Sequence, residues 1–571
     1  MVTALRKKIP IGIEFYKEMI DKGYYYVDKT LLIRDLLAQG NKVTLFIRPR
    51  RFGKTLAQTM LKTFFEKEVL RDGTVADNSV YFKGKKIMEA GEEYTSKIGQ
   101  YPVIFMSLKS AKQPTFEMAC NKLCDSIANE YSRHRYLLEG DSITEEDKEK
   151  YLSILKGKAD YSTALKFLSQ CLEKYHGQKT VILLDEYDVP LENAYFSGFY
   201  GEMVLFIRSL FESALKTNES LEFAVVTGCL RISRESIFTG LNNLKVVSVL
   251  DESYAEYFGF TQDEVDVFLK TYGIMDRRKE AKEWYDGYLF GNTEVYNPWS
   301  VINYVYDIVY ENTEFPKPYW SNTSSNNIIR RLVENADDRT RQELEELIEG
   351  GTIEKPVHED ITYADVYKSQ DNLWNFLFFT GYLKAAGRSF KNDMIYLSME
   401  MPGKEIRYIY KNSVMDWFIQ HVDGQNLTGL TEAFESGDCE KASDIITEQL
   451  MDTISFYDYR EDYYHGFLAG LLKNNGKYIV KSNRESGLGR YDLILKTRRI
   501  LKGRAILLEF KVADSVHGLE EGCMEALNQI EDKHYENDVL EEGYPSVLKY
   551  GICFYKKECL VMQGNAQQTD I

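Results

Sequence analysis

The chain has 571 residues, of which 44% are hydrophobic and 28% are charged, and it contains only 11 Pro and 38 Gly. This composition excludes a single small module and a long disordered or collagen-like region, and ordinary domain sizes predict about three or four domains. The formal net charge is −17. The surface as a whole therefore repels a polyanion, and any contact with nucleic acid needs a local basic patch.

Cysteine usage and the N-terminus indicate the compartment. The eight cysteines form no C-x-x-C pair and have no neighbouring His at zinc-ligand spacing, which favours reduced thiols in the core. Basic residues near the N-terminus are not followed by an apolar stretch, and no window of about 18 apolar residues occurs. The sequence therefore predicts a cytoplasmic protein with no membrane partner.

The first 250 residues alternate short apolar runs rich in β-branched residues with longer helical patterns, which is typical of βα units around a parallel sheet. Because the strands are apolar, helices should cover both faces of the sheet. We expect an α/β domain with a doubly wound parallel sheet over residues 1–256. Its expected strands are 43–47, 103–108, 180–184, 221–227 and 245–250.

Two further regions follow. Residues 257–454 have helical periodicity and predict a mainly helical lid or linker, to which no chemistry can be assigned. Residues 455–571 predict the order αβββαβ. Its expected elements are a helix at 462–473, strands at 477–481, 491–496 and 505–510, a helix at 519–535 and a strand at 547–555.

A phosphate-binding pattern follows the first expected strand, where residues 48–55 read RPRRFGKT. In the P-loop pattern G-x-x-x-x-G-K-[ST], backbone N–H groups wrap the phosphates, the Lys reaches the β- and γ-phosphates, and the hydroxyl holds Mg²⁺. Arg48 replaces the first glycine, which normally lets the chain turn without a Cβ clash. A chance Gly-Lys-Thr is the alternative. The residues assigned to the nucleotide are Arg50, Arg51, Phe52, Gly53, Lys54 and Thr55.

Two of these assignments carry more detail. Thr55 is the expected metal ligand of the loop. The charges of Arg50 and Arg51 either compensate phosphate or pair with nearby carboxylates.

A second motif, VILLDE at 181–186, places two carboxylates at the end of an apolar strand. In this Walker B arrangement Asp185 is the metal ligand and Glu186 the catalytic carboxylate that polarises the attacking water. An acidic turn after a buried strand is the alternative. Two matching motifs on consecutive strands of one expected sheet, at the edge where such sheets bind ligands, favour an ATP site. Hydrolysis of ATP additionally needs a correctly placed water and a sensor of the γ-phosphate.

The fourth expected strand ends at Thr227, the position where such an ATPase places a polar sensor of the γ-phosphate. Beyond it, Arg231 and Arg234 are candidates for arginine fingers, and surface arginines on a loop are an equal alternative.

The motif set resembles the bacterial AAA-ATPase-like family, relatives of the archaeal-type ATPases of the STAND class. The resemblance covers residues 5–300 and includes the Arg at the first P-loop position. It implies an ATP-binding switch or motor rather than a metabolic kinase. The motifs that carry it are YYYVDKT at 24–30, RPRRFGKT at 48–55, LDEYD at 184–188, FTGLNN at 238–243, WYDGY at 284–288 and YNP at 296–298.

The C-terminal region holds a candidate metal site. Asp492 enters one expected strand, and Glu509 and Lys511 close the next. Residues i and i+2 of a strand point to the same face, so the three side chains should meet at one end of the sheet. Carboxylates suit Mg²⁺ or Mn²⁺ as metal ligands, and a lysine can orient water and stabilise charge at phosphorus. A solvated strand edge is the alternative.

The charge pattern favours the catalytic interpretation. Residues 473–511 contain eleven Lys and Arg against three acidic residues, a balance of +8 within a chain of net charge −17. Such a basic island can hold a phosphate backbone. The strand around Glu509 is strongly apolar, which is unusual for a solvated face.

Together with Gln529, these residues and the αβββαβ order resemble the PD-(D/E)XK nuclease superfamily over residues 455–560. The resemblance implies metal-dependent DNA cleavage with Asp492, Glu509 and Lys511 in the central roles. Gln529 and Tyr535 lie on the following helix, where they can face the site or nucleic acid. Glu485, Glu461 and His465 are weaker candidates for outer metal ligands.

The main hypothesis is an ATP-regulated DNA nuclease that requires Mg²⁺, or Mn²⁺ at the nuclease site, and analogy suggests defence against foreign DNA. One alternative is a nucleotide-dependent signalling or scaffold protein whose nuclease-like domain only binds nucleic acid. Another is a DNA motor without cleavage. A motor needs a broad basic channel, which the net charge of −17 does not indicate, although a homo-oligomer could build one. The choice between DNA and RNA stays open at this point.

Overall fold

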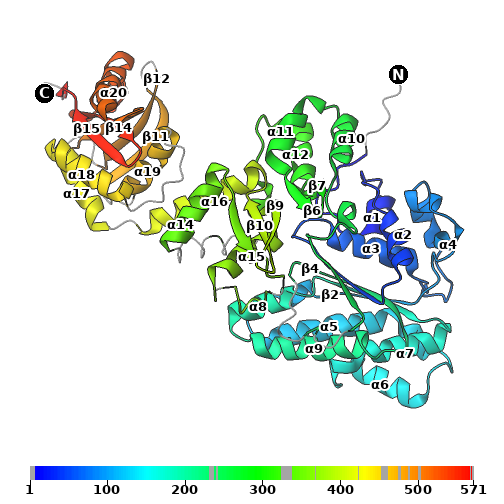
Figure 1. Ribbon diagram of the computed structural model, residues 1–571. Helices are drawn as coiled ribbons and strands as arrows, with labels where there is room; N and C mark the ends of the chain where they lie inside the picture. Colours follow the sequence, from blue (N-terminus) through cyan, green and yellow to red (C-terminus); the bar gives the residue numbers. More distant parts are fainter. Residues whose placement is uncertain are drawn as a thin grey trace, which may run out of the picture. The chain divides into compact units, whose positions relative to one another are not determined.

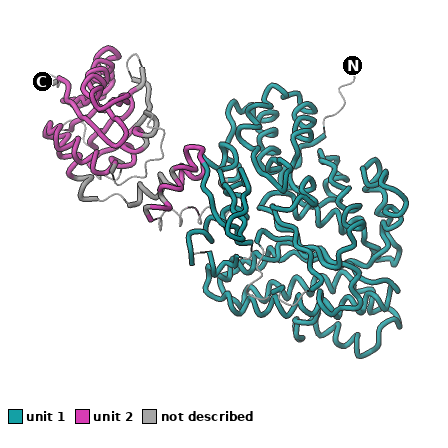
Figure 2. Tube along the Cα trace, viewed as in Figure 1, with its two compact units in different colours: residues 1–322, 352–407 teal, residues 323–351, 408–571 magenta. Residues whose placement is uncertain are grey.

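A computed structural model gives the fold (Figure 1). It describes residues 7–230, 237–238, 242–322, 329, 337–359, 361–366, 368–421, 424–451, 461–473, 477–486, 489–498, 503–565 and 567–568. The chain forms two compact units (Figure 2). Unit 1 contains residues 1–322 and 352–407, and unit 2 contains residues 323–351 and 408–571.

A five-stranded parallel sheet forms the centre of unit 1. Its strands are β1 (Val43–Ile47), β2 (Val103–Ser107), β3 (Thr180–Asp185), β4 (Leu221–Gly228) and β5 (Leu244–Val247), in the order β2-β3-β4-β1-β5. The predicted α/β fold is confirmed. The expectation of consecutive strands for the two motifs is wrong, because β2 separates β1 from β3 in the chain and β4 separates them in the sheet.

Helices cover both faces of this sheet. Helix α3 lies on one face, and α5, α7 and α9 lie on the other (Figure 1). Gln58 of α3 donates to the carbonyl oxygens of Leu184 in β3 and Val225 in β4, which fixes the helix across two strands. The helices up to β5 are α1 (Tyr16–Asp21), α2 (Leu31–Gln39), α3 (Lys54–Phe65), α4 (Glu92–Thr95), α5 (Phe116–Arg133), α6 (Glu145–Leu155), α7 (Ala164–His176), α8 (Val189–Ser197) and α9 (Tyr200–Leu215).

The middle region is mainly helical, as predicted, but it also contains two small antiparallel sheets. One is the hairpin β6–β7, and the other has the order β8-β10-β9. The exposed, charged sequence of β9 lacks the alternation that identifies a strand. The elements are α10 (Gln262–Tyr272), α11 (Arg278–Tyr285), β6 (Tyr288–Phe290), β7 (Thr293–Val295), α12 (Pro298–Tyr310), β8 (Ile353–Pro356), α15 (Gln370–Thr380), β9 (Lys384–Lys391), β10 (Met394–Glu400) and α16 (Gly403–His421).

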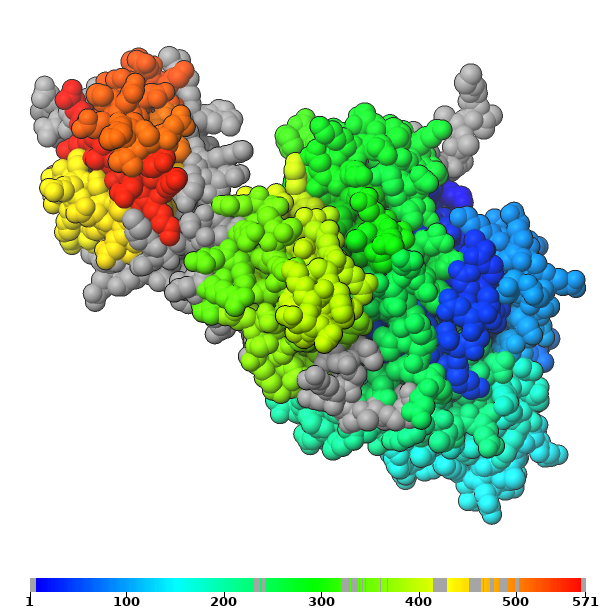
Figure 3. All heavy atoms as spheres, viewed as in Figure 1, coloured from blue at the N-terminus to red at the C-terminus, as the bar shows by residue number. Residues whose placement is uncertain are grey.

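Residues 352–407 pack against residues 257–322 within unit 1, as the yellow-green and green atoms of Figure 3 show. Trp320 and Tyr382 are both buried, with ring centroids 4.7 Å apart. Glu405, in the first turn of α16, accepts hydrogen bonds from Ser300 Oγ at 2.8 Å and from the Trp320 N–H at 2.8 Å. Burial raises the pKa of Glu405 to about 7. These contacts join two distant parts of the sequence.

Unit 2 contains a mixed sheet in the order β11-β12-β13-β14-β15, with β16 paired to β14. Strands β13 and β14 are parallel and the other pairs are antiparallel. The predicted αβββαβ order is confirmed and extended by β15 and β16. The elements are α14 (Asp338–Glu349), α17 (Gly424–Ser436), α18 (Cys439–Met451), α19 (Glu461–Lys473), β11 (Tyr478–Ser486), β12 (Gly489–Thr497), β13 (Ala505–Val512), α20 (Leu519–Lys533), α21 (Asn537–Glu541), β14 (Ser546–Tyr555), β15 (Glu558–Gln563) and β16 (Gln567–Gln568).

Each face of this second sheet has its own core. Helices α17, α18 and α19 bury Leu508 and Phe510 of β13 on one face. Helices α20 and α21 bury Leu507 of the same strand on the other. Because side chains alternate along a strand, Glu509 and Lys511 share the face of Leu507, beside α20. No helix of the described residues is long and apolar enough to cross a membrane.

The close approach of α20 to β14 generates a first prediction. A Cβ on Gly551 would lie 2.3 Å from the carbonyl oxygen of Cys523 in α20. Gly551→Ala should therefore destabilise unit 2 by about 2 kcal/mol, as overpacking does. Hydrogen exchange of peptides from β13 and β14 should become faster. Gly429→Ala is the matched control, because its Cβ would make only an ordinary contact, 3.5 Å from Ile445; equal exchange in the two variants would contradict the prediction.

Candidate nucleotide and nuclease sites

The loop between β1 and α3 has the backbone of an anion-binding turn. Arg51 has φ +70° and Gly53 has φ +79°, and Gly53 caps the N-terminus of α3. Left-handed residues at alternate positions turn N–H groups toward one concave side, to which the helix N-terminus adds its positive end. The loop is therefore shaped to hold a phosphate.

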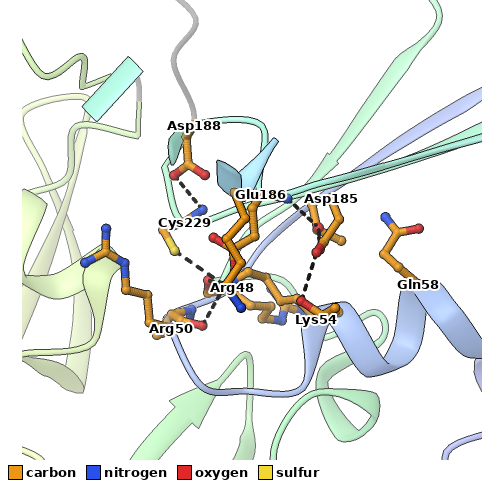
Figure 4. Close-up of polar contacts among 12 residues, drawn as sticks. Arg48, Arg50, Lys54, Gln58, Asp185, Glu186, Asp188 and Cys229 are labelled. Atoms are coloured by element: carbon orange, nitrogen blue, oxygen red, sulfur yellow. Dashed lines mark hydrogen bonds and ion pairs between the residues drawn. The ribbon is translucent and has the colours of Figure 1, made fainter. Parts of the chain in front are cut away.

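Lys54 is buried at the start of α3 and lies inside the loop (Figure 4). Its ammonium group donates to the carbonyl oxygens of Arg48 at 3.1 Å and Pro49 at 3.0 Å, and to Cys229 Sγ at 3.4 Å. Glu186 Oε1 lies 3.7 Å away. Burial alone would lower the pKa of Lys54, but Cys229 and the carboxylates around it raise that pKa. Lys54 is therefore a fixed positive charge at the loop.

Asp185 is the centre of a hydroxyl network. Its carboxylate accepts hydrogen bonds from Thr55 at 2.8 Å and Thr227 at 2.7 Å, and a weaker one from Ser107 at 3.5 Å. Burial raises the pKa of Asp185, the nearby Glu186 charge adds to this, and the two threonine hydroxyls oppose it. The network joins the ends of β2, β3 and β4 to the first turn of α3.

The turn after β3 gathers further polar groups. Glu186 has a left-handed backbone, with φ +55°. Asp188 is buried, and one carboxylate oxygen accepts the N–H groups of Cys229 at 2.8 Å and Leu230 at 3.1 Å. Burial raises the pKa of Asp188 to about 6 and that of the Cys229 thiol to about 12. Ligand atoms of Glu186, Asp188 and Cys229 lie within 4.8 Å of one another. This turn therefore holds the end of β4 beside Lys54.

The other loop side chains point away from Asp185. Arg50 forms an ion pair with Glu192 of α8, which is one of the two alternatives that the sequence left open. Its pKa is raised despite burial, mainly by Glu192. The Arg51 guanidinium lies 4.3 Å from the ring centroid of Trp299, and Phe52 is buried among aromatic rings. The side chains of residues 50–52 thus contact other protein groups in this structure, and the roles predicted for them at the nucleotide stay predictions.

These groups fit a magnesium nucleotide. The Thr55 hydroxyl and the Asp185 carboxylate are hard oxygen ligands whose oxygen atoms lie 2.8 Å apart, close enough for both to bind one cation. Lys54 and the turned N–H groups supply the positive charge that phosphates need. Arg231 and Arg234 lie outside the described residues, as does part of the FTGLNN motif.

In unit 2, the predicted nuclease residues meet on the face of the sheet that α20 covers. Asp492 accepts the N–H of Phe510 at 2.8 Å and donates its own N–H to Glu509 at 3.3 Å. Lys511 donates to Gln529 Oε1 at 2.7 Å, and the Gln529 amide in turn donates to Glu509, whose side chain is buried. The Gln529 side chain therefore bridges the carboxylate and the ammonium of the Glu-x-Lys pair.

The donor set of this site fits a hard divalent cation, since Asp492 and Glu509 supply only oxygen atoms. His465 of α19 contacts the backbone carbonyl of Asp492 at 2.9 Å. Tyr535 lies 3.5 Å from the Gln529 amide. The side chains of Glu461 and Glu485 lie outside the described part of the chain. The roles predicted for all of these residues stay predictions.

Part of the predicted basic island is neutralised within unit 2. Lys477 forms an ion pair with Glu435, and Lys496 forms one with Glu542 at 2.7 Å. Arg504 donates to the backbone carbonyl of Glu435 at 3.4 Å. A count of charges along the sequence therefore overstates the positive charge available to a polyanion.

Sequence reasoning missed Asp188 and Cys229. Asp188 lies two residues after the Walker B motif in LDEYD, so its position in the turn after a strand was the available signal. Nothing in the local sequence indicated Cys229, because its contact with Lys54 depends on the insertion of β4 between β1 and β3.

Comparisons with known proteins agree with this geometry. Residues 10–238 match the family described as "Predicted AAA-ATPase", and residues 459–564 match the PD-(D/E)XK nuclease superfamily. Both resemblances inferred from the sequence are thereby confirmed: the chain carries an AAA-ATPase-like domain and a PD-(D/E)XK domain. A protein of Azotobacter chroococcum mcd 1, described as "Uncharacterized protein in vnfD 5'region", is 24% identical over 559 residues, which is 95% of each chain.

The site geometry generates a second prediction. Glu186→Gln keeps the size of the side chain but cannot polarise water, so ATP should bind and persist unhydrolysed. Binding of Mg·ATP and release of phosphate are measured on the same samples. Lys54→Ala is the reference variant, because it removes the ammonium group that reaches the phosphates and should lose binding. An equal loss in Glu186→Gln would count against Glu186 as the catalytic carboxylate.

Proposed function

We propose that this protein binds and hydrolyses Mg·ATP in unit 1 and that its nucleotide state controls a metal-dependent deoxyribonuclease in unit 2. The observation that carries the proposal is the meeting of Lys54, Thr55 and Asp185 around one anion-binding turn. A second meeting, of Asp492, Glu509 and Lys511, occurs in unit 2. Defence against foreign DNA is the role that analogy favours.

In the proposed ATPase, each side chain has a distinct task. Thr55 and Asp185 would hold Mg²⁺, which neutralises phosphate charge when bound. Lys54, held by its loop carbonyls, would contact the phosphates with its ammonium group, and Thr227 would orient Asp185 through its hydroxyl. Glu186 lies beside Lys54 with part of its side chain exposed, so it can take a proton from water at the edge of the sheet.

In the proposed nuclease, Asp492 and Glu509 would hold Mg²⁺ or Mn²⁺, which supplies Lewis acidity at the phosphodiester. Lys511 would orient the attacking water and stabilise the charge that develops on phosphate oxygens. The Gln529 bridge supports this, because it fixes the Lys511 ammonium relative to Glu509. A domain that only binds nucleic acid has no need of this arrangement, which favours cleavage over the scaffold alternative.

The third prediction separates the two roles in the nuclease. Asp492→Ala and Lys511→Ala should each abolish cleavage of plasmid and linear DNA. Asp492→Ala should also weaken Mn²⁺ binding, whereas Lys511→Ala should leave it unchanged or tighter because a nearby positive charge is removed. Calorimetry with Mn²⁺ alone distinguishes them. Cleavage that persists in both variants would leave unit 2 as a binding module, and cleavage of RNA alone would correct the substrate.

The fourth prediction concerns control by nucleotide. Helix α16 begins in unit 1 and continues beyond Arg407 into unit 2, so one helix belongs to both. If the nucleotide state biases unit 2 through such connections, Lys54→Ala should change the rate of DNA cleavage by about fivefold or more, as typical coupling energies allow. Cleavage is measured with and without ATP. Equal rates for both proteins in both conditions would mean that the two activities are independent.

A further inference from the structure

The P-loop of this chain is held by aromatic residues from the segment after β5. Phe52 packs against Tyr288 and Phe290 of β6, with ring centroids 4.9 and 5.2 Å away. The Arg51 guanidinium stacks over Trp299 in the first turn of α12. We name Phe258, Tyr288, Phe290 and Trp299 the aromatic socket. All four are far from the loop in sequence and belong to the same compact unit.

Arg48, the residue in place of the usual glycine, is the most deeply buried part of this contact. It is fully buried, and its guanidinium lies 4.9 Å from the ring centroid of Phe290 and 5.5 Å from that of Phe258. One guanidinium nitrogen donates to the carbonyl oxygens of Ile47 at 3.0 Å and Val247 at 3.3 Å. Arg48 therefore ties the ends of β1 and β5 to the socket.

A buried guanidinium needs compensation for its lost hydration. Burial lowers the pKa of Arg48 to about 9, and the negative charge of Asp251 opposes this. The side chain thus remains charged at neutral pH, and two ring faces and two strand-end carbonyls stabilise it. Burying a guanidinium costs hydration free energy, and the general P-loop pattern has a glycine at this position. We therefore expect the Arg48 side chain to have a specific role in this loop.

The task follows from the backbone of the same residue. Lys54 donates to the carbonyl oxygens of Arg48 and Pro49, so the Arg48 side chain fixes the peptide group on which the lysine rests. Pro49 is itself packed closely, since a Cβ on Gly381 would lie 2.8 Å from it. The side chains of Arg48 and Pro49 thus anchor the loop to the rest of unit 1, on the side of the loop that lies away from Asp185.

We propose that Arg48 is a positioning residue for Lys54. The aromatic socket holds Arg48 in place and in this way sets the affinity of the loop for the phosphates of a nucleotide. This inference rests on the proposed ATP binding and deepens it. The socket replaces the conformational freedom of a glycine with a fixed anchor, so the loop is held in its anion-binding shape before the nucleotide arrives.

The first experiment restores the glycine of the general P-loop pattern. Arg48→Gly should weaken binding of a non-hydrolysable Mg·ATP analogue by about tenfold, because the cation–π contacts and strand-end hydrogen bonds are lost. Arg48→Lys keeps the charge but not the planar fork, and should recover part of the affinity. In steady-state kinetics, Arg48→Lys should raise KM more than it lowers kcat, since Asp185 and Glu186 are untouched.

A second experiment tests the socket without changing the loop. Phe290→Leu should weaken binding of the analogue severalfold, and in Phe290→Leu combined with Arg48→Lys the two losses should be non-additive. Phe268→Leu is the matched control, because Phe268 of α10 is equally buried but stacks on Tyr25, away from the loop. It should leave the affinity of the folded protein unchanged.

The outcomes separate the inference from the proposed function. A wild-type protein that does not bind the analogue would overturn ATP binding itself. If the wild type binds, equal or tighter binding by Arg48→Gly would overturn the role of Arg48. Equal losses in Phe290→Leu and Phe268→Leu would show a general stability effect and would also overturn it.

Discussion

The architecture of unit 1 depends on one buried carboxylate. Asp185 ends β3 with no exposed surface, and a charge in that position needs hydrogen bonds to offset its lost hydration. The hydroxyls of Thr55 and Thr227 provide them from α3 and β4. The strand order follows a functional logic here, because β4 must lie next to β3 for Thr227 to reach Asp185. A shift of any of these elements would leave the carboxylate unsatisfied.

The sequence predicted the parts of the two sites that lie at strand ends. The strand before Lys54 and the strand before Asp185 were both apolar runs followed by polar motifs, and all residues of β1 are buried as expected. The common face of Glu509 and Lys511 followed from the two-residue period of a strand, and Asp492 followed from its place on the neighbouring strand. In the first two cases the polar residues directly follow an apolar strand, and in the third the two side chains lie two positions apart on one strand.

The remaining features depended on tertiary contacts that leave no local pattern. The sequence could not show that β4 lies between β1 and β3, and so it missed the contact of Cys229 with Lys54. The strand β8 has only four residues and β9 is charged and exposed, so neither has an alternating pattern that identifies it. The basic island was overestimated, because Glu435 and Glu542, which pair with its lysines, lie outside the counted segment. No sequence pattern around Phe258 and Phe290 indicated that their rings pack against the Arg48 guanidinium.

The chain passes between the two units three times, after residues 322, 351 and 407. A protein cut after residue 322 would lack Glu405 and Tyr382, and Ser300 and Trp320 would lose the partners that bury them. The two compact units are therefore interleaved along the sequence, although the two family-matched segments, residues 10–238 and 459–564, follow one another without overlap. No single cut of the chain separates the two units, because a cut at any point from residue 322 to residue 408 divides at least one of them.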